Sequence, residues 1–419
     1  MSHLKVSATS RFDRSLTGRL SSAIGSAPVR LALWDGSEYC PHGVVPVGTV
    51  LIKKRSALLK LLLEPELYFG EGYSAGDIEV EGNLIEMLDA VYRAGARQPS
   101  SRWFPALLAR WLSWAQANSL SGSRRNIRHH YDIGTSFYQL WLDPQLVYTC
   151  AYFKNPDDTL EDAQIAKMDH VCRKLRLQPG DSVVEAGCGW GALALHMARK
   201  YGVTVKAFNI SRDQINYARR RADLERLGAR VEFIEDDYRN LSGTHDAFVS
   251  VGMLEHVGLN HYRDFGAVIN RCLSKRGRGF IHFIGRNRPK RLSLWTRRRI
   301  FPGGYVPALR EALGLLEDWD FSILDVENLR LHYARTLQHW LERYERSRET
   351  ITEMFSPEFV RMWRLYLTGS IAAFRSGSMQ LFQISFARGS DNAIPWTRDH
   401  IYPAHDENEQ EKKCIPAMS

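Results

Sequence analysis

The spacing of apolar residues changes character along the chain, and these changes predict its domains. Between residues 31 and 94, short apolar runs broken by Gly and Pro, such as GVVPVGTVLI, precede the helical pattern of NLIEMLDAVYRAG. This predicts a small α+β domain over residues 1–96. Residues 97–125 show weaker periodicity and indicate a linker with a helix near residues 105–118. The main domain is expected at 126–390 and a loosely ordered tail at 391–419.

Strand-like apolar runs alternate with helical patterns from Asp181 onwards. The order is SVVEAG, ALALHMARKYG, VTVKAFNI, RDQINYARRRADLERLG, RVEFIEDD, DAFVSVGM, a helix and GFIHFIG. Such alternation is typical of βαβ units, so the predicted class is α/β, with a doubly wound, mostly parallel sheet. Ligands then bind beyond the carboxyl ends of the strands. Helices near 332–350 and 357–375 and a strand at 379–387 are expected to complete the domain.

Composition narrows the class of protein further. No apolar run approaches the roughly 18 to 20 residues that span a bilayer, and residues 1–20 lack the apolar core of a secretion signal, which predicts a cytoplasmic location. The six cysteines form no CxxC pair or Cys/His cluster, so no disulfide framework or metal site is indicated. The formal charge of +9 favours an anionic partner, either nucleic acid or a membrane surface.

A glycine-rich turn follows the first strand of the main domain. Its spacing, E-x-G-x-G-x-G from Glu185 to Gly191, differs from the GxGxxG of dinucleotide-binding proteins and lacks the GK[ST] ending of nucleotide-phosphate loops. The second strand ends at Asn209, where doubly wound folds place a polar group against a ribose. The third ends in Asp237 and Tyr238, an acid and an aromatic suited to adenine. Together these strand ends predict an adenosyl pocket.

Further motifs extend beyond this turn. They are, in chain order, HHYDIGTSFYQLWLD (129–143), VYTCAYF (147–153), EAGCGWG (185–191), SVGMLEHVG (250–258), FIHFIG (280–285), RRRIFPGGYVP (297–307) and FRSGSMQLFQISFARG (374–389). In these motifs the chain resembles the cyclopropane-fatty-acyl-phospholipid synthase family, which includes the mycolic acid cyclopropane synthases. The resemblance implies a seven-stranded class I methyltransferase (Rossmann-like) sheet, S-adenosylmethionine as cofactor and a lipid-associated N-terminal domain.

The resemblance also implies a reaction, the transfer of a methylene group to the cis double bond of an unsaturated phospholipid acyl chain. The alkene attacks the sulfonium methyl, and loss of a methyl proton from the resulting carbocation closes a cyclopropane ring. Because an alkene is a poor nucleophile, catalysis must hold the reactants in contact, stabilise the cation and place a base. In this family the base is bicarbonate, and the residues here that match its ligands are Cys150, Glu255, His282 and Tyr333, with the backbone at Ile284.

Cofactor contacts follow in the same way. The resemblance implies Tyr131, Tyr148, Thr149, Gly187, Gly189, Asn209, Gln214 and Tyr238, and the pattern of the turn and strand ends adds Glu185 and Asp237. Two positions depart from the family. Ser370 stands where many relatives have cysteine, so no nucleophilic cysteine is assigned there. Glu185 replaces the commoner Asp, which leaves its direct contact with the cofactor open.

Each of the proposed bicarbonate ligands is also compatible with a purely structural role. Cys150 is compatible with an inert buried thiol, and His282 with a satisfied histidine in the core. Glu255 is compatible with a role in capping a helix, and Tyr333 with the core aromatic of an amphipathic helix. The surrounding VYTCAYF motif favours the catalytic interpretation for Cys150, and both interpretations stay open for the other three residues.

A basic segment suggests where a membrane would bind. Seven basic residues between Arg286 and Arg299 are interleaved with Leu292, Leu294 and Trp295. Basic side chains among apolar anchors suit an anionic bilayer, at about 1 kcal/mol per basic residue. We therefore expect peripheral association with the inner face of the membrane, although a solvated loop is also compatible with the pattern. A homodimer is compatible with the sequence as well.

Three other functions remain open at this stage. The same carbocation could yield a methyl- or methylene-branched chain, and the sequence does not indicate where the proton leaves. The charge permits methylation of nucleic acid, but there is no NPP[FY] signature and no added RNA-binding module, so no nucleic-acid partner is expected. A lipid-binding protein with a degenerate transferase domain is disfavoured by the complete glycine turn.

Overall fold

A small four-stranded sheet with helices forms the N-terminal part of the molecule. The computed structural model describes residues 10–97 and 133–402. The sheet has the order β2-β1-β3-β4. The elements are α1 (Arg11–Ala23), β1 (Arg30–Leu33), β2 (Glu38–Tyr39), β3 (Gly48–Ile52), α2 (Arg55–Leu63), α3 (Pro65–Ala75), β4 (Ile78–Gly82) and α4 (Leu84–Arg97). The helix expected at 105–118 lies outside the described residues.

The large sheet has seven strands in the order β10-β11-β9-β8-β5-β6-β7. Strand β11 is antiparallel to β9 and β10, and the other neighbours are parallel. The predicted doubly wound, mostly parallel sheet is therefore confirmed. The strands are β5 (Ser182–Ala186), β6 (Thr204–Asn209), β7 (Val231–Glu235), β8 (His245–Val251), β9 (Leu273–Gly285), β10 (Phe321–Asn328) and β11 (Gln380–Arg388).

Helices bury apolar side chains against both faces of this sheet. On one face α8 (Leu160–Leu175), α9 (Ala192–Tyr201) and α10 (Arg212–Leu224) pack on residues such as Val183 and Val249. On the other, α12 (Tyr262–Cys272) and α14 (Leu309–Glu317) pack on Phe248 and Phe386. Short elements connect these layers: α7 (Thr135–Gln139), η1 (Tyr238–Asn240), α11 (Leu254–Val257), η2 (Leu259–His261) and α13 (Leu294–Arg299).

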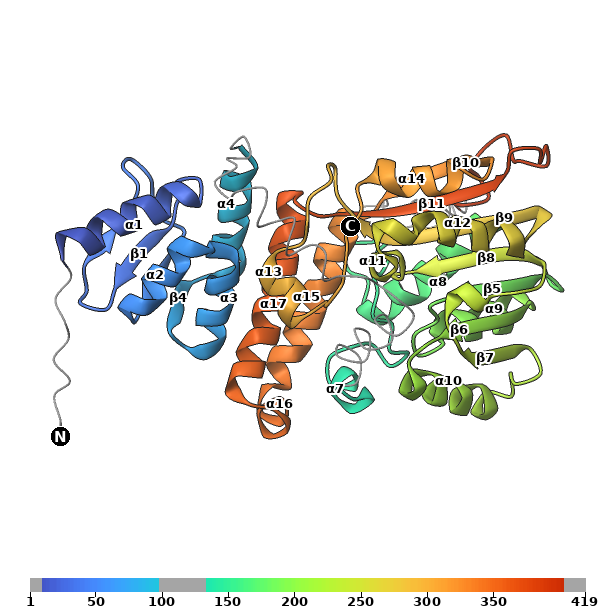
Figure 1. The fold of residues 1–419 in the computed structure, drawn as a ribbon. Helices are drawn as coiled ribbons and strands as arrows, with labels where there is room; N and C mark the ends of the chain where they lie inside the picture. The colour runs from blue at the N-terminus through green and yellow to red at the C-terminus, as the bar shows by residue number, and fades with distance from the viewer. Residues whose placement is uncertain (1–9, 98–132, 403–419) are drawn as a thin grey trace, which may run out of the picture.

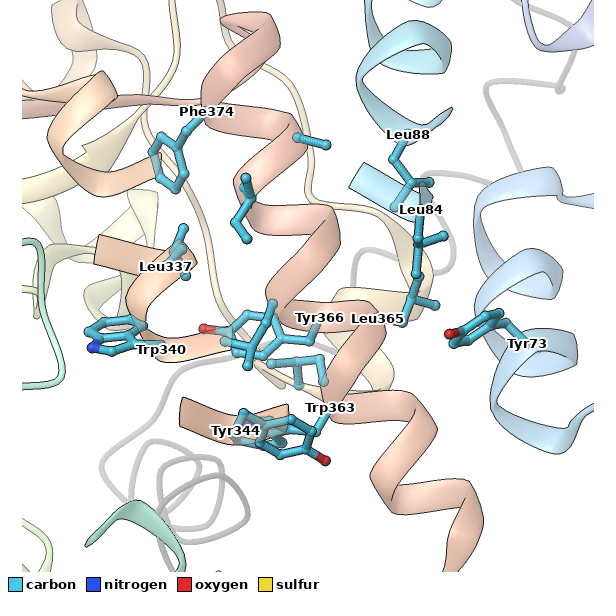
Figure 2. Close-up of a cluster of buried hydrophobic side chains, with 14 of the residues drawn as sticks. Tyr73, Leu84, Leu88, Leu337, Trp340, Tyr344, Trp363, Leu365, Tyr366 and Phe374 are labelled. Carbon is cyan, nitrogen blue, oxygen red and sulfur yellow. The ribbon is translucent and has the colours of Figure 1, made fainter. Parts of the chain in front are cut away.

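A helical layer lies between the small sheet and the large one (Figure 1). It contains α15 (Arg330–Arg346), α16 (Arg348–Met354) and α17 (Pro357–Ser376). Figure 2 shows α17 with Leu84 and Leu88 of α4 on one side and Trp340 of α15 on the other. These side chains belong to a single cluster of buried residues that runs from α1 to α17. The small sheet and the helical layer therefore share one core.

Three features differ from the sequence-based expectations. The sequence pattern did not predict strand β10, because its bulge and its charged residues Asp325 and Glu327 interrupt the alternation of apolar and polar residues. The helix expected at 332–350 ends at Arg346, and a separate helix begins at Arg348. In the expected tail, residues 391–402 pack against the main domain, with Ile401 buried and Arg398 paired with Asp325.

Candidate active site

The glycine-rich turn joins β5 to α9. Gly187, Gly189 and Gly191 have φ of 87°, 53° and 84°, a region that residues with a Cβ rarely adopt. Space also requires glycine at Gly191, since a Cβ there would lie 2.6 Å from the Phe233 ring. A Cβ at Gly189 would meet no atom within 4 Å. The turn is therefore packed tightly at one glycine and open at another.

A cavity lies at the carboxyl ends of β5, β6 and β7. Its lining includes four of the predicted cofactor residues, brought together from three strand ends. The lining residues are Gly187, Phe208, Asn209, Ile210, Asp236, Asp237, Tyr238, Met253, His256 and Val257. The cavity has the position that doubly wound folds give to a bound ligand.

The Asn209 side chain ties the second strand end to the glycine turn. Its Nδ2 donates to Gln214 Oε1 at 2.7 Å and to Gly189 O at 3.3 Å. Its Oδ1 accepts a hydrogen bond from Ser211 N at 3.2 Å. Gln214 is buried on α10 and does not line the cavity, so it orients Asn209.

Asp237 and Tyr238 form the wall beyond the third strand. Asp237 Oδ1 accepts a hydrogen bond from Arg239 N at 3.0 Å and caps η1. The Tyr238 ring lies edge-on to Phe265 at 5.3 Å, and the Arg239 guanidinium lies 5.2 Å from its centre. Burial raises the pKa of Tyr238. The wall offers a carboxylate and an aromatic face, which suits a nucleoside.

The remaining predicted cofactor residues lie elsewhere. Tyr148 Oη shares a hydrogen bond with Tyr366 Oη at 2.9 Å. Thr149 lies beside the end of β8, because a Cβ at Gly252 would be 2.9 Å from its methyl group. Glu185 is buried and does not line the cavity, and burial raises its pKa to about 8. Tyr131 lies outside the described residues.

Glu255 lies on α11, two residues after the cavity residue Met253. Its Oε1 accepts a hydrogen bond from Ile284 N at 2.6 Å. Its Oε2 is buried and has no hydrogen-bond partner among the described residues. Burial raises the pKa of Glu255 to about 7, against the opposing effect of the Ile284 hydrogen bond. One carboxylate oxygen is therefore fixed and the other is free to bind a ligand.

His282 lies on β9, two residues before Ile284, and is 1% exposed. Its Nδ1 lies 3.2 Å from Gln383 Nε2, and its Nε2 is buried with no hydrogen-bond partner among the described residues. Burial and the charges of Lys167 and Lys174 hold the pKa of His282 well below its usual value. The imidazole is therefore neutral at pH 7.

Cys150 and Tyr333 meet at the backbone of Leu329. Cys150 Sγ donates weakly to Ala151 O at 3.2 Å and lies 3.9 Å from Leu329 O, which also accepts from Tyr333 N at 3.1 Å. Burial raises the pKa of Cys150, which keeps it a thiol. Leu329 N donates to Leu381 O, and Leu381 is the strand partner of Ile284. Contacts therefore connect Cys150 and Tyr333 with the Glu255 site.

Lys167 on α8 is a site residue that the sequence reasoning missed. Its Nζ donates to Thr149 Oγ1 at 3.1 Å, and it interacts electrostatically with Cys150, Glu185 and His282. Burial lowers its pKa to about 8. The available signal was a polar stripe at helical spacing in a buried helix, formed by Gln164, Lys167, His170 and Lys174. We call Cys150, Lys167, Glu255, His282 and Tyr333 the polar cluster.

The basic segment does not present its apolar residues as the sequence suggested. Trp295 is 8% exposed, and its indole would lie 2.4 Å from a Cβ at Gly70 of α3. Arg299 pairs with Glu71 on the same helix. Leu292 is also buried, and only Leu294 is exposed. The expectation that all three apolar residues anchor a bilayer is therefore corrected, because Trp295 packs against the N-terminal part of the molecule.

Residues 10–97 and 133–402 contain neither a membrane-spanning helix nor a cluster of metal-binding side chains. No helix there is long and apolar enough to cross a membrane. No group of three or more His, Cys, Asp or Glu side chains there could hold a metal ion.

Comparisons with known proteins identify a family and several relatives of the chain. Residues 118–384 match the family described as mycolic acid cyclopropane synthetase, and residues 18–98 match a domain of unknown function. A probable fatty acid methyltransferase of Pseudomonas putida is 34% identical, covering 90% of this chain and 96% of its own. The cyclopropane-fatty-acyl-phospholipid synthase of Escherichia coli K12 is 35% identical, covering 84% of this chain and 91% of its own.

A solved structure extends the likeness to three dimensions. A mycolic acid cyclopropane synthase complexed with SAH and CTAB is 30% identical, with a TM-score of 0.60, and covers 63% of this chain and 97% of its own. The predicted class I methyltransferase sheet is therefore confirmed. In that relative the same fold binds SAH, the demethylated form of S-adenosylmethionine.

Proposed function

The chain belongs to the mycolic acid cyclopropane synthetase family, and from this premise we propose that it forms cyclopropane rings on unsaturated acyl chains of membrane phospholipids, with S-adenosylmethionine as the methylene donor. The phospholipid is proposed by likeness to the Escherichia coli relative. One observation carries the proposal: two buried polar atoms, Glu255 Oε2 and His282 Nε2, have no hydrogen-bond partner among the described residues. Glu255 accepts a hydrogen bond from Ile284 N, two residues after His282 on β9.

We propose that the cavity binds the cofactor and that the polar cluster holds the base. Asn209, Asp237 and Tyr238 would hold the adenosyl group at the strand ends. Met253 lines the cavity and Glu255 follows two residues later, so the same short segment serves both regions. The acyl double bond would therefore have to reach the place where the cavity and the cluster adjoin, because the reactants must be held in contact.

The carbocation needs stabilisation without a nucleophile that could trap it. Tyr148 lies among the rings of Tyr138, Trp141 and Trp340 at 5.2 to 5.4 Å, and Tyr333 packs 4.7 Å from Phe374. Aromatic faces attract cations by about 0.5 to 2 kcal/mol each. Because its pKa is raised, Cys150 stays a neutral thiol and is a poor nucleophile.

We propose bicarbonate, held by the polar cluster, as the base. His282 Nε2 can donate to an anion, and Glu255 Oε2 can accept from a bicarbonate hydroxyl. The Tyr333 hydroxyl and, once turned away from Ala151 O, the Cys150 thiol would be further donors. When bound there, bicarbonate would supply a basic oxygen close to the cation. Glu255, with its pKa near 7, can hold that hydroxyl and exchange a proton with it at neutral pH.

A second candidate is methyl or methylene branching of the acyl chain. It is favoured by the Pseudomonas putida relative, which is named a probable fatty acid methyltransferase and covers more of this chain. The two reactions share the cofactor, the alkene and the carbocation, and they differ only in how the cation is quenched.

The purified enzyme, bicarbonate and vesicles of an unsaturated phospholipid, with trideuteromethyl-labelled cofactor, test the proposal. A ring or an exomethylene group forms with loss of one deuterium, whereas loss of a proton from the acyl chain leaves an unsaturated chain whose methyl branch keeps all three. Ozonolysis then cleaves the exomethylene and leaves the ring intact. We expect a ring that resists ozonolysis, and vesicles of saturated lipid serve as the control. Absence of any labelled lipid would overturn the proposal, and a branched product would select the second candidate.

A further inference from the structure

Gln383 occupies the middle of a polar row that crosses three adjacent strands. It is fully buried on β11. Its strand partners are His282 on β9 and Glu327 on β10. Since directly paired residues point to the same face of a sheet, the row Glu327, Gln383, His282 lies on one face. The polar row is therefore continuous with the polar cluster.

The side-chain amide of Gln383 contacts the His282 ring through its nitrogen. Gln383 Nε2 lies 3.2 Å from His282 Nδ1. With the amide nitrogen on this side Nδ1 accepts, and a neutral imidazole then carries its proton on Nε2. That Nε2 is the buried atom that has no hydrogen-bond partner among the described residues. The other amide atom, Gln383 Oε1, is also buried with no hydrogen-bond partner among the described residues.

The groups around His282 keep its ring neutral, so the position of its single proton decides which nitrogen can donate. Lys167, His170 and Lys174 face it from α8 and Glu327 from β10. Burial and the two lysines keep the pKa of His282 well below its usual value, so the ring has one N–H. A ring protonated on Nδ1 would present a lone pair to the cluster and repel an anion.

We infer that Gln383 is a positioning residue that fixes His282 as the Nε2–H tautomer, so that the neutral ring donates a hydrogen bond to an anion held in the polar cluster. This inference rests on the proposed function for the identity of the anion. A neutral donor suits the task, because an imidazolium would pass its proton to the base and quench it.

Nuclear magnetic resonance reads the tautomer without any activity. In protein with ¹⁵N-labelled histidine, long-range ¹⁵N–¹H correlations distinguish Nε2–H from Nδ1–H rings, and loss of one signal set in His282→Asn assigns His282. We expect the Nε2–H form. The Nδ1–H form would overturn the inference and leave the proposed function standing.

Gln383→Glu adds a kinetic test. The new carboxylate accepts from Nδ1, which moves the ring proton away from Nε2, so we expect kcat to fall about 10- to 100-fold at pH 8 with KM for phospholipid unchanged. At lower pH the carboxyl takes a proton and donates as the amide did. Activity relative to the wild type should therefore recover as the pH falls, which a merely structural role would not produce.

Gln380→Glu is the matched control. Gln380 is also a buried glutamine on β11, but it bonds to Asn328 and Gly377 and does not contact His282. We expect its activity to follow the wild type across the pH range. The inference fails if Gln383→Glu and Gln380→Glu show the same pH profile, and it stands if only Gln383→Glu changes.

Discussion

The cofactor cavity and the polar cluster lie side by side but are built in different ways. Much of the cavity is lined by residues at or just after the ends of three neighbouring strands, as with Gly187, Asn209 and Asp237. The cluster draws single residues from elements far apart in the chain, including α8, α11, β9 and α15. Backbone geometry therefore shapes the first region, and tertiary packing of isolated side chains shapes the second. Substitutions in the two regions should consequently impair different properties of the enzyme.

Glu255→Gln should have the largest effect, and it should lower kcat without changing cofactor affinity. The amide keeps the shape but cannot take up a proton, so we expect kcat to fall about 10²- to 10⁴-fold. Binding of SAH, measured by calorimetry, should stay within about twofold of the wild type, since Glu255 does not line the cavity. A parallel loss of SAH affinity would show that Glu255 also contributes to cofactor binding.

Gly191→Ala should act on stability first. Its φ of 84° and the 2.6 Å approach to Phe233 combine backbone strain with overpacking, which together cost about 3 kcal/mol. Denaturant unfolding measures this loss. Gly189→Ala is the matched control, because its Cβ meets no atom and should cost about 1 kcal/mol. Equal losses for both variants would contradict this account of the turn.

Glu327→Gln should change how stability depends on pH. Burial opposes ionisation of Glu327, but the His170 hydrogen bond and Lys174 outweigh it and lower its pKa to about 2 from 4.5. A lowered pKa contributes stability above pH 4.5, which is lost as the pH falls towards 2. The variant should lose about 2 kcal/mol at pH 7 and show a flatter dependence between these values. Unchanged acid unfolding would refute the ion pair.

Asn209→Ala should have the smallest effect. It removes hydrogen bonds to Gln214 and Gly189 that fix the strand end, so SAH affinity should fall about fivefold. At saturating cofactor, kcat should match that of the wild type because the polar cluster is intact. A lower kcat at saturation would mean that the cavity also positions the methyl group.

The two regions also differ in how far sequence reasoning could reach. The turn and strand ends of the cavity were predictable, since glycine spacing and strand ends are local signals. Glu255 and His282 were proposed only through the family resemblance, because a single buried acid or histidine has no local pattern. Lys167 was missed although α8 carries polar residues at helical spacing. Strand β10 was missed because Asp325 and Glu327 face the lysine of α8 and not an apolar core.

Helix α17 has a consequence for how the molecule unfolds. Its side chains pack on α4 and on α15 within one buried cluster (Figure 2). Elements that share a core lose their packing together, so the N-terminal part and the helical layer should melt in one cooperative transition. A fragment ending after α4 would expose Leu84 and Leu88 to water. Such a fragment should aggregate when expressed alone and become soluble only when the rest of the chain is supplied.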